Sequence, residues 1–175
     1  FENWWYNLKS VTIPASVTSI GKDAFRDCSG IEKVNISDIT AWCEISFENQ
    51  YANPLYKAHH LYLNDNEITD LVIPNATTHI GVSAFYGASY ITSVVIPHSV
   101  TKIGNNAFRE CTNLSSVNMA DNVIKIGEYA FAKCENLVSL LLSNSIDSIQ
   151  YGAFSDCSAL TLINLPDSLV CIEIR

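Results

Sequence analysis

The 175-residue chain lacks the features that would place it in a membrane or on a nucleic acid. No run reaches the roughly 18 apolar residues that a bilayer-spanning helix needs. No stretch joins more than two Lys or Arg residues, and the formal net charge is -8. Nucleic acids and anionic membrane surfaces attract clustered positive charge, so we expect neither as a partner. The chain should nevertheless fold, because 48% of its residues are hydrophobic and only 16% are charged.

Short motifs that carry common chemistries are also missing. There is no C-x-x-C pair for zinc, no G-x-S-x-G elbow for a nucleophilic serine and no glycine-rich phosphate loop. His59 and His60 could join Asp65 and Glu67 around a metal, but adjacent side chains on an extended chain point to opposite faces. We therefore predict no enzyme activity, no cofactor and no metal.

Neither end of the chain carries a recognisable targeting signal. The chain begins at Phe1 instead of Met, and no basic-then-apolar segment opens it. The stretch "FENWW" resembles the end of a preceding unit, and "LVCIEIR" ends in mid-pattern without a polar cap. We expect a fragment of a longer array, or end-to-end self-association through exposed strand edges.

One phrase recurs along the chain, as "TSIGKDAFRDCSGI" from residue 18, "TKIGNNAFRECTNL" from residue 101 and "IKIGEYAFAKCENL" from residue 124. Units aligned on a leading Leu or Ile begin at Leu8, Ile31, Ile68, Ile91, Leu114, Leu137 and Leu160. Successive starts lie 23 residues apart, except that 37 residues separate Ile31 from Ile68. A fixed period of this length predicts a solenoid, because one coil cannot bury its apolar face alone and stacked coils share theirs.

Each unit predicts a strand, a second short extended piece and a tight turn. In "ITSVVIP", Val94 and Ile96 face one side and Val95 faces the other. Proline ends the strand because it has no N–H for a ladder. Gly104, like its counterparts in other units, is expected to supply a turn, after which "NNAFREC" brings Phe108 inward.

The phrase I-P-x-x-V-x-x-I-G-x-x-A-F-x-x-C is nearly complete at 13–28 and 96–111, and recurs with substitutions at 73–88, 119–134 and 142–157. In this phrase the chain resembles the BspA-like, or Treponema-type, leucine-rich repeat proteins. The resemblance implies one solenoid domain over residues 1–175, a right-handed coil of 23-residue units with a parallel sheet on its concave side. It also implies a bacterial cell-surface or secreted protein that adheres to host matrix proteins, other surface proteins or glycans.

Residues 31–67 form the one irregular unit. Asp38 is expected to cap a helix whose apolar face holds Ile39, Trp42, Cys43 and Phe47. The stretch "LYLNDNEITDLVI" predicts a hairpin around a polar turn at 64–67 that feeds the next strand.

Two interpretations of this irregular unit remain open. It could be an atypical coil in which Trp42 and Phe47 close the core. It could instead be a projecting binding element, with Trp42, Tyr51 and Tyr56 as exposed aromatic anchors.

The six cysteines are interpreted as small buried hydrophobic residues. Cys28, Cys111, Cys134 and Cys157 share one inward repeat position, where parallel Cβ vectors on adjacent coils suit a disulfide poorly.

The sequence favours a non-catalytic binding module. Its contacts are expected on the outward residues of the concave sheet, which are Thr12, Asn35, Val72, Val95, Asn118, Leu141 and Asn164. The alternative is a spacer whose repeats hold another domain away from the cell and bind no ligand. A contiguous exposed apolar or aromatic patch would favour the binding module.

Overall fold

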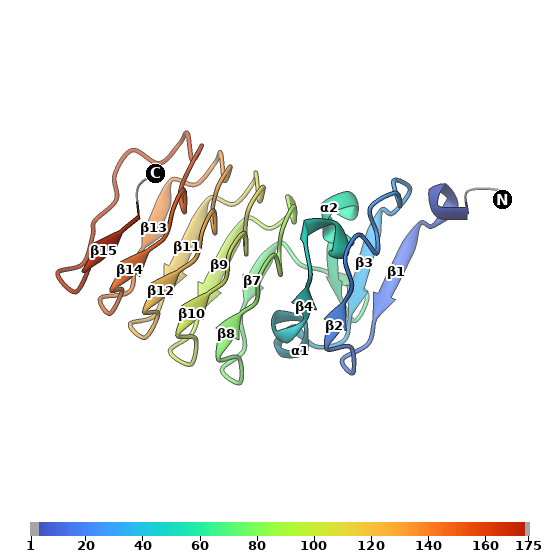
Figure 1. Cartoon of the computed structure of the whole chain (residues 1–175), viewed down its shortest axis with the longest axis horizontal. Helices are drawn as coiled ribbons and strands as arrows, with labels where there is room; N and C mark the ends of the chain where they lie inside the picture. The colour runs from blue at the N-terminus through green and yellow to red at the C-terminus, as the bar shows by residue number, and fades with distance from the viewer. Residues whose placement is uncertain (1–3, 174–175) are drawn as a thin grey trace.

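The computed structural model describes residues 4–173 and shows a solenoid of about seven turns of about 23 residues (Figure 1). The coils stack from the N-terminal to the C-terminal end, as the repeat period predicts. The interpretation of "FENWW" as the end of a preceding unit falls partly on residues outside the described range. No helix within residues 4–173 has both the length and the apolar character needed to cross a membrane.

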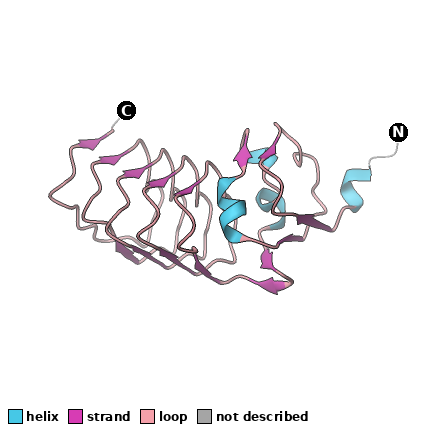
Figure 2. Ribbon diagram, turned by 90° about the horizontal axis from the view of Figure 1, so that it is seen from below, coloured by secondary structure: helices cyan, strands magenta, loops and turns pink. Residues whose placement is uncertain are grey.

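The strands form two layers on opposite sides of the stack (Figure 2). The first layer contains two four-stranded sheets, in the orders β1-β3-β5-β6 and β13-β11-β9-β7. The second layer contains a pair, β2-β4, and a five-stranded sheet in the order β15-β14-β12-β10-β8. All neighbouring strands are parallel except β5 and β6.

The strands of the first layer are β1 (Ser10–Ile13), β3 (Lys33–Ile36), β5 (Leu61–Leu63), β6 (Asn66–Glu67), β7 (Asp70–Val72), β9 (Ser93–Ile96), β11 (Ser116–Met119) and β13 (Ser139–Leu141). The strands of the second layer are β2 (Ser19–Ile20), β4 (Ser46–Phe47), β8 (His79–Ile80), β10 (Lys102–Ile103), β12 (Lys125–Ile126), β14 (Ser148–Ile149) and β15 (Cys171–Ile172). The helices are η1 (Trp4–Asn7), α1 (Ile39–Glu44), η2 (Gln50–Ala52) and α2 (Leu55–Ala58).

The space between the layers is filled by identical side chains stacked coil on coil. Phe85, Phe108, Phe131 and Phe154 stack nearly parallel, with successive ring centroids 5.2, 5.1 and 5.7 Å apart. The prediction that Phe108 points inward is confirmed, since it is fully buried. In β9, Val94 and Ile96 are buried while Val95 is exposed, which confirms the predicted alternation.

The turn that carries each phenylalanine is also hydrogen-bonded from coil to coil. The Phe85 N–H donates to the Ala107 carbonyl at 2.8 Å, and the Phe108 N–H donates to the Ala130 carbonyl at 2.7 Å. These bonds satisfy turn amides that a lone coil would leave without partners. Stacking therefore supplies both the apolar contacts and the polar partners that a coil needs.

The repeated glycine begins a turn, as predicted, since the Ala107 N–H donates to the Gly104 carbonyl at 3.3 Å. Gly104 lies outside the left-handed region, but a Cβ built on it would lie only 2.8 Å from the Gly81 carbonyl carbon in the neighbouring coil. Glycine is needed there because two backbones approach closely. The equivalent Gly21 has nothing within 4 Å of such a Cβ. Gln150 occupies the same repeat position near the C-terminal end, so the crowding is greatest in the inner coils.

The two glycines make a matched pair for measuring this crowding. Gly104→Ala should lower the free energy of unfolding by about 1–3 kcal/mol, because the methyl group must push two coils apart. Gly21→Ala should leave stability unchanged or raise it slightly, since alanine restricts the unfolded chain. Urea unfolding of both variants checks this, and equal losses would contradict the close-approach explanation.

The irregular unit begins with the predicted helix. Asp38 caps α1, and its side chain accepts a hydrogen bond from the Ala41 N–H at 2.9 Å. Phe47 lies in β4 and not in the helix, yet its ring centroid lies 5.3 Å from that of Trp42. The atypical-coil interpretation is therefore confirmed for these two residues, which are both buried.

The predicted hairpin is present, with a shorter turn than expected. In β5 and β6, Tyr62 pairs with Glu67 and Leu63 pairs with Asn66. The turn itself consists of Asn64 and Asp65, which both adopt positive φ angles of 49° and 65°. Two-residue turns of this kind match the twist of the strands that they join, so strand pairing resumes directly after Asp65. Asn66 and Glu67 therefore belong to β6 and not to the turn.

Both strand layers are interrupted at the irregular unit, where side chains replace the backbone ladder. The Asn53 Nδ2 donates to the carbonyls of Ser83 and Ala84 at 2.7 and 3.0 Å, and the Trp42 Nε1 donates to Ala84 at 2.8 Å. The His59 Nδ1 donates to the Gly87 carbonyl at 2.7 Å. These three side chains connect the N-terminal coils to the regular stack, together with a bond of 3.1 Å between the Thr40 and Thr77 hydroxyls and the Gly81 N–H, which donates to the Cys43 carbonyl at 2.9 Å.

Asn53 is the residue on which this junction depends most. Asn53→Ala would leave the Leu55 N–H, which donates to Asn53 Oδ1 at 2.9 Å, without a partner, and would remove the bonds to the Ser83 and Ala84 carbonyls. We expect a loss of about 2–5 kcal/mol in the free energy of unfolding, since the unpaired buried N–H costs about 1–3 kcal/mol and each lost hydrogen bond to a carbonyl about 0.5–1.5 kcal/mol. Asn136→Ala, at an exposed asparagine, is the control and should change stability by less than about 1 kcal/mol. Thermal and urea unfolding provide the measurement.

Candidate binding surfaces

The first layer presents the predicted outward residues in one row across four strands. Val72, Val95, Asn118 and Leu141 are cross-strand partners in the parallel register of β7, β9, β11 and β13. The exposed fractions of the three apolar residues are 59%, 43% and 60% in that order. We call these four residues the layer-1 row. Asn164, one repeat further on, is exposed but does not lie in a strand.

The two remaining predicted contacts belong to the N-terminal half of the first layer. Thr12 pairs with Asn35, and Asn35 pairs in turn with Tyr62 of the hairpin. The Asn35 Oδ1 accepts from the Asp65 N–H at 3.0 Å, and Lys33 pairs with the Asp65 carboxylate at 2.7 Å. Asn35 is therefore half-buried and holds the hairpin turn in place. Thr12 is exposed.

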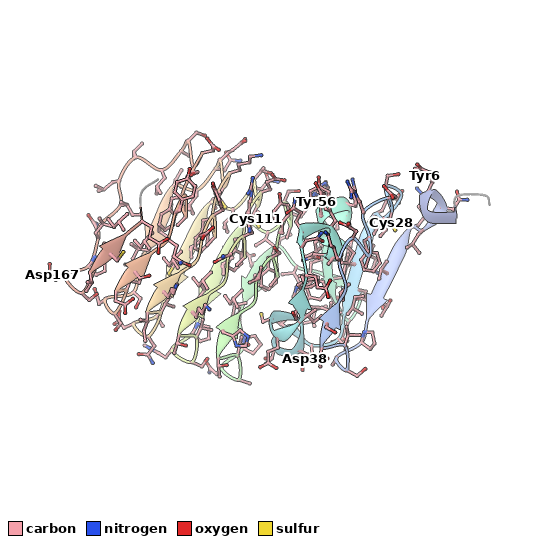
Figure 3. The ribbon with its side chains drawn as sticks, viewed as in Figure 1. Tyr6, Cys28, Asp38, Tyr56, Cys111 and Asp167 are labelled. Carbon is pink, nitrogen blue, oxygen red and sulfur yellow. The ribbon has the colours of Figure 1, made fainter. Side chains whose placement is uncertain are left out.

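The predicted aromatic anchors do not form an exposed patch. Trp42 is only 1% exposed, because its ring closes the core of the irregular unit, so it offers no surface to a partner. Tyr51 and Tyr56 are half-buried against each other, with ring centroids 5.1 Å apart. Tyr56 belongs to α2, and Figure 3 places it at the edge of the coil opposite Asp38.

The two tyrosines instead begin a row of rings that continues along the turns. Tyr56 contacts Tyr86 at a centroid distance of 5.6 Å, and Arg109 lies over the rings of Tyr86 and Tyr129 at 5.9 and 5.1 Å. Burial, together with the nearby Glu110 carboxylate, raises the pKa of Tyr86 to about 12. These rings and charges contact one another, so they pack neighbouring turns together.

The side chains of the two adjacent histidines bond to different partners, as expected from side chains that point to opposite faces of the chain. His59 donates to the Gly87 carbonyl, whereas His60 bonds to Glu67 and stacks on Tyr90 with a centroid distance of 3.6 Å. Within residues 4–173, no three His, Cys, Asp or Glu side chains are grouped in a way that could hold a metal ion.

All six cysteines lie within the described residues, and all are free. The thiols of Cys111 and Cys134 donate to the carbonyls of Phe85 and Phe108, each at 3.2 Å. Burial raises the pKa of both thiols well above the ordinary value. The predicted burial is thus confirmed for them, and also for Cys28 and Cys43, whereas Cys157 is half-buried and Cys171 is exposed.

Thiol reactivity should follow this order of exposure. In the folded protein an aromatic disulfide reagent should modify Cys171 first and Cys157 more slowly, because the thiolate must reach solvent to react. The four buried thiols should react only after denaturant is added. Counting released chromophore with and without denaturant checks this, and Cys171→Ser should remove the fast phase alone. Rapid modification of Cys111 or Cys134 in the native protein would contradict the burial of these thiols.

The second layer has a groove at its interruption. A hollow of about 390 Å³ lies between β4 and β8, which do not pair with each other. Its lining includes Phe47, His79, Val82, Lys102 and Asn105. His79 was not predicted to belong to a site, although it shares a repeat position with Lys102.

Comparison with known proteins identifies the repeat. The family described as "BspA type Leucine rich repeat region" matches residues 1–53 and 58–174 in six copies. No curated protein is significantly similar to the chain.

Solved structures of leucine-rich repeat proteins were also compared with the chain, and the first of them shares its fold. One from Bacteroides ovatus is 25% identical, with a TM-score of 0.64, over 97% of this chain and 48% of its own. A leucine-rich repeat protein of T. pallidum is 24% identical, with a TM-score of 0.49, over 89% of this chain and 66% of its own. The chain thus spans about half the length of the Bacteroides ovatus protein.

Proposed function

Since the chain belongs to the BspA-type leucine-rich repeat family, we propose that it is a non-catalytic binding module of a bacterial surface or secreted adhesin-like protein. Its partner is a matrix protein, another surface protein or a glycan, and the layer-1 row makes the central contacts.

The observation that supports this proposal is the apolar character of the layer-1 row. Val72 and Val95 are direct cross-strand neighbours, and Leu141 lies in the same register two strands beyond Val95. Val138, next to β13, is another exposed apolar residue, with an exposed fraction of 63%. Large apolar side chains gathered on one face commonly mark an interaction site.

A spacer would not need this row. The inner faces of β7, β9, β11 and β13 already stabilise the stack, so exposed valine and leucine on the outer face add little to folding. Polar residues would serve there equally well, as Asn118 in the same row demonstrates. The distribution of exposed apolar side chains therefore favours the binding module over the spacer.

Asn118 also suggests the variant that tests the proposal. Val95→Asn with Leu141→Asn extends the existing asparagine along the row, so the sheet should still form. Binding to a panel of immobilised matrix proteins and glycans should weaken at least about tenfold, because apolar anchors in an interface typically contribute 1 kcal/mol or more each. Surface plasmon resonance provides the measurement.

The matched control places the same substitution on the other layer. Val170→Asn with Ile172→Asn replaces two exposed apolar residues, one on β15 and one just before it. The control should bind as the unmodified protein does. Equal weakening in both variants would show a general apolar effect, and no binding by the unmodified protein to any member of the panel would support the spacer.

A further inference from the structure

The second layer carries a row of basic side chains across three neighbouring strands. His79, Lys102 and Lys125 are cross-strand partners in the parallel register of β8, β10 and β12. All three point outward, opposite the buried Ile80, Ile103 and Ile126. Neighbouring strands lie about 4.8 Å apart, so the row spans about 10 Å. We call it the basic row.

The two lysines lie side by side without an ion-pair partner. Lys9, Arg26, Lys33, Arg109 and Lys133 each lie within 4 Å of a carboxylate. Among the described residues, Lys22, Lys57, Lys102 and Lys125 have no such partner, and of these four only Lys102 and Lys125 are cross-strand neighbours. Like charges directly opposite each other destabilise a sheet. The folded protein therefore keeps a repulsion between these two side chains.

The basic row leads into the groove between β4 and β8. Both His79 and Lys102 line the groove, and Val82, which is 47% exposed, gives it apolar surface. Ser46, Asn105 and Glu44 add polar groups that can donate to or accept from hydroxyls. The volume of about 390 Å³ lies in the range of small-ligand sites.

We propose that the groove and the basic row together bind an acidic oligosaccharide, with one sugar ring in the groove and its negative groups along Lys102 and Lys125. An apolar patch of the ring contacts Val82. The hydroxyls of the ring bond to Ser46, Asn105 and Glu44. This site deepens the proposed binding function but uses the layer opposite the layer-1 row.

A sugar that carries few charges fits this site better than a nucleic acid does. Nucleic-acid binding rests on neutralising many phosphates, and here only two lysines and one histidine are aligned. The net charge of -8 repels a densely charged polymer, whereas a uronate- or sulfate-bearing oligosaccharide presents a few anions between neutral hydroxyls.

The test compares two variants of equal charge change. Lys102→Gln with Lys125→Gln removes the basic row's lysines, and Lys9→Gln with Lys22→Gln removes two exposed lysines of the N-terminal coils. Calorimetric titration uses a chondroitin-sulfate-derived hexasaccharide, a hyaluronan-derived hexasaccharide, maltohexaose and a single-stranded oligonucleotide. We expect at least one acidic hexasaccharide to bind, and to bind about tenfold or more weakly to the first variant only. Binding of the chondroitin sulfate fragment alone identifies sulfate as the recognised anion, and binding of both identifies the carboxylate.

Several results would overturn the proposal. They are no binding of either acidic hexasaccharide, equal weakening in the control variant, or oligonucleotide binding as tight as that of the sugars. The Val95→Asn, Leu141→Asn variant separates this proposal from the proposed function. It should keep acidic-sugar binding, and its loss there would place the sugar on layer 1.

A second measurement needs no ligand. Lys102→Gln should raise the melting temperature at low salt, because it relieves the repulsion of Lys125, and the gain should shrink as salt is added. An unchanged or lowered melting temperature would contradict the repulsion.

Discussion

The close approach of one coil to the next is the constraint on which the rest of this structure depends. Phenylalanine rings about 5 Å apart fill the interior, and turn amides find their acceptors in the neighbouring coil. The same approach leaves no room for a Cβ at Gly104. A single coil has neither the apolar contacts nor the hydrogen-bond partners to persist, so stability is a property of the stack.

In the irregular unit, side-chain hydrogen bonds join one coil to the next in place of a regular strand ladder. Its extra 14 residues, the difference between 37 and 23, separate the strands of both layers. Asn53 and Trp42 then donate to the Ala84 carbonyl, whose counterparts Ala107 and Ala130 accept backbone N–H groups in the regular coils. His59 adds a bond to the Gly87 carbonyl. A consequence of the same interruption is the groove between β4 and β8, because two strand edges that would otherwise pair are held apart.

The two layers differ in the surfaces that they offer. The layer-1 row exposes valine and leucine, whereas the second layer exposes His79, Lys102 and Lys125 beside the groove. Inward positions are occupied by the same residue types in coil after coil, so they carry the fold. Outward positions vary freely, and the proposed contacts of both layers lie among them.

The sequence by itself determined the local and periodic features of this protein. Alternation predicted that Val94 faces inward and Val95 outward, Asp38 predicted the start of α1, and the 23-residue period predicted the solenoid, because each depends on neighbouring residues or on regular spacing. Only the tertiary structure decided that Trp42 is buried and that Lys102 and Lys125 lack a carboxylate partner. It also decided that Gly104 is required because the backbone of the neighbouring coil lies close to it. The period aligns His79 with these lysines. Burial and pairing, however, depend on which side chains of other coils come near, and the irregular unit changes that arrangement through contacts that no local pattern contains.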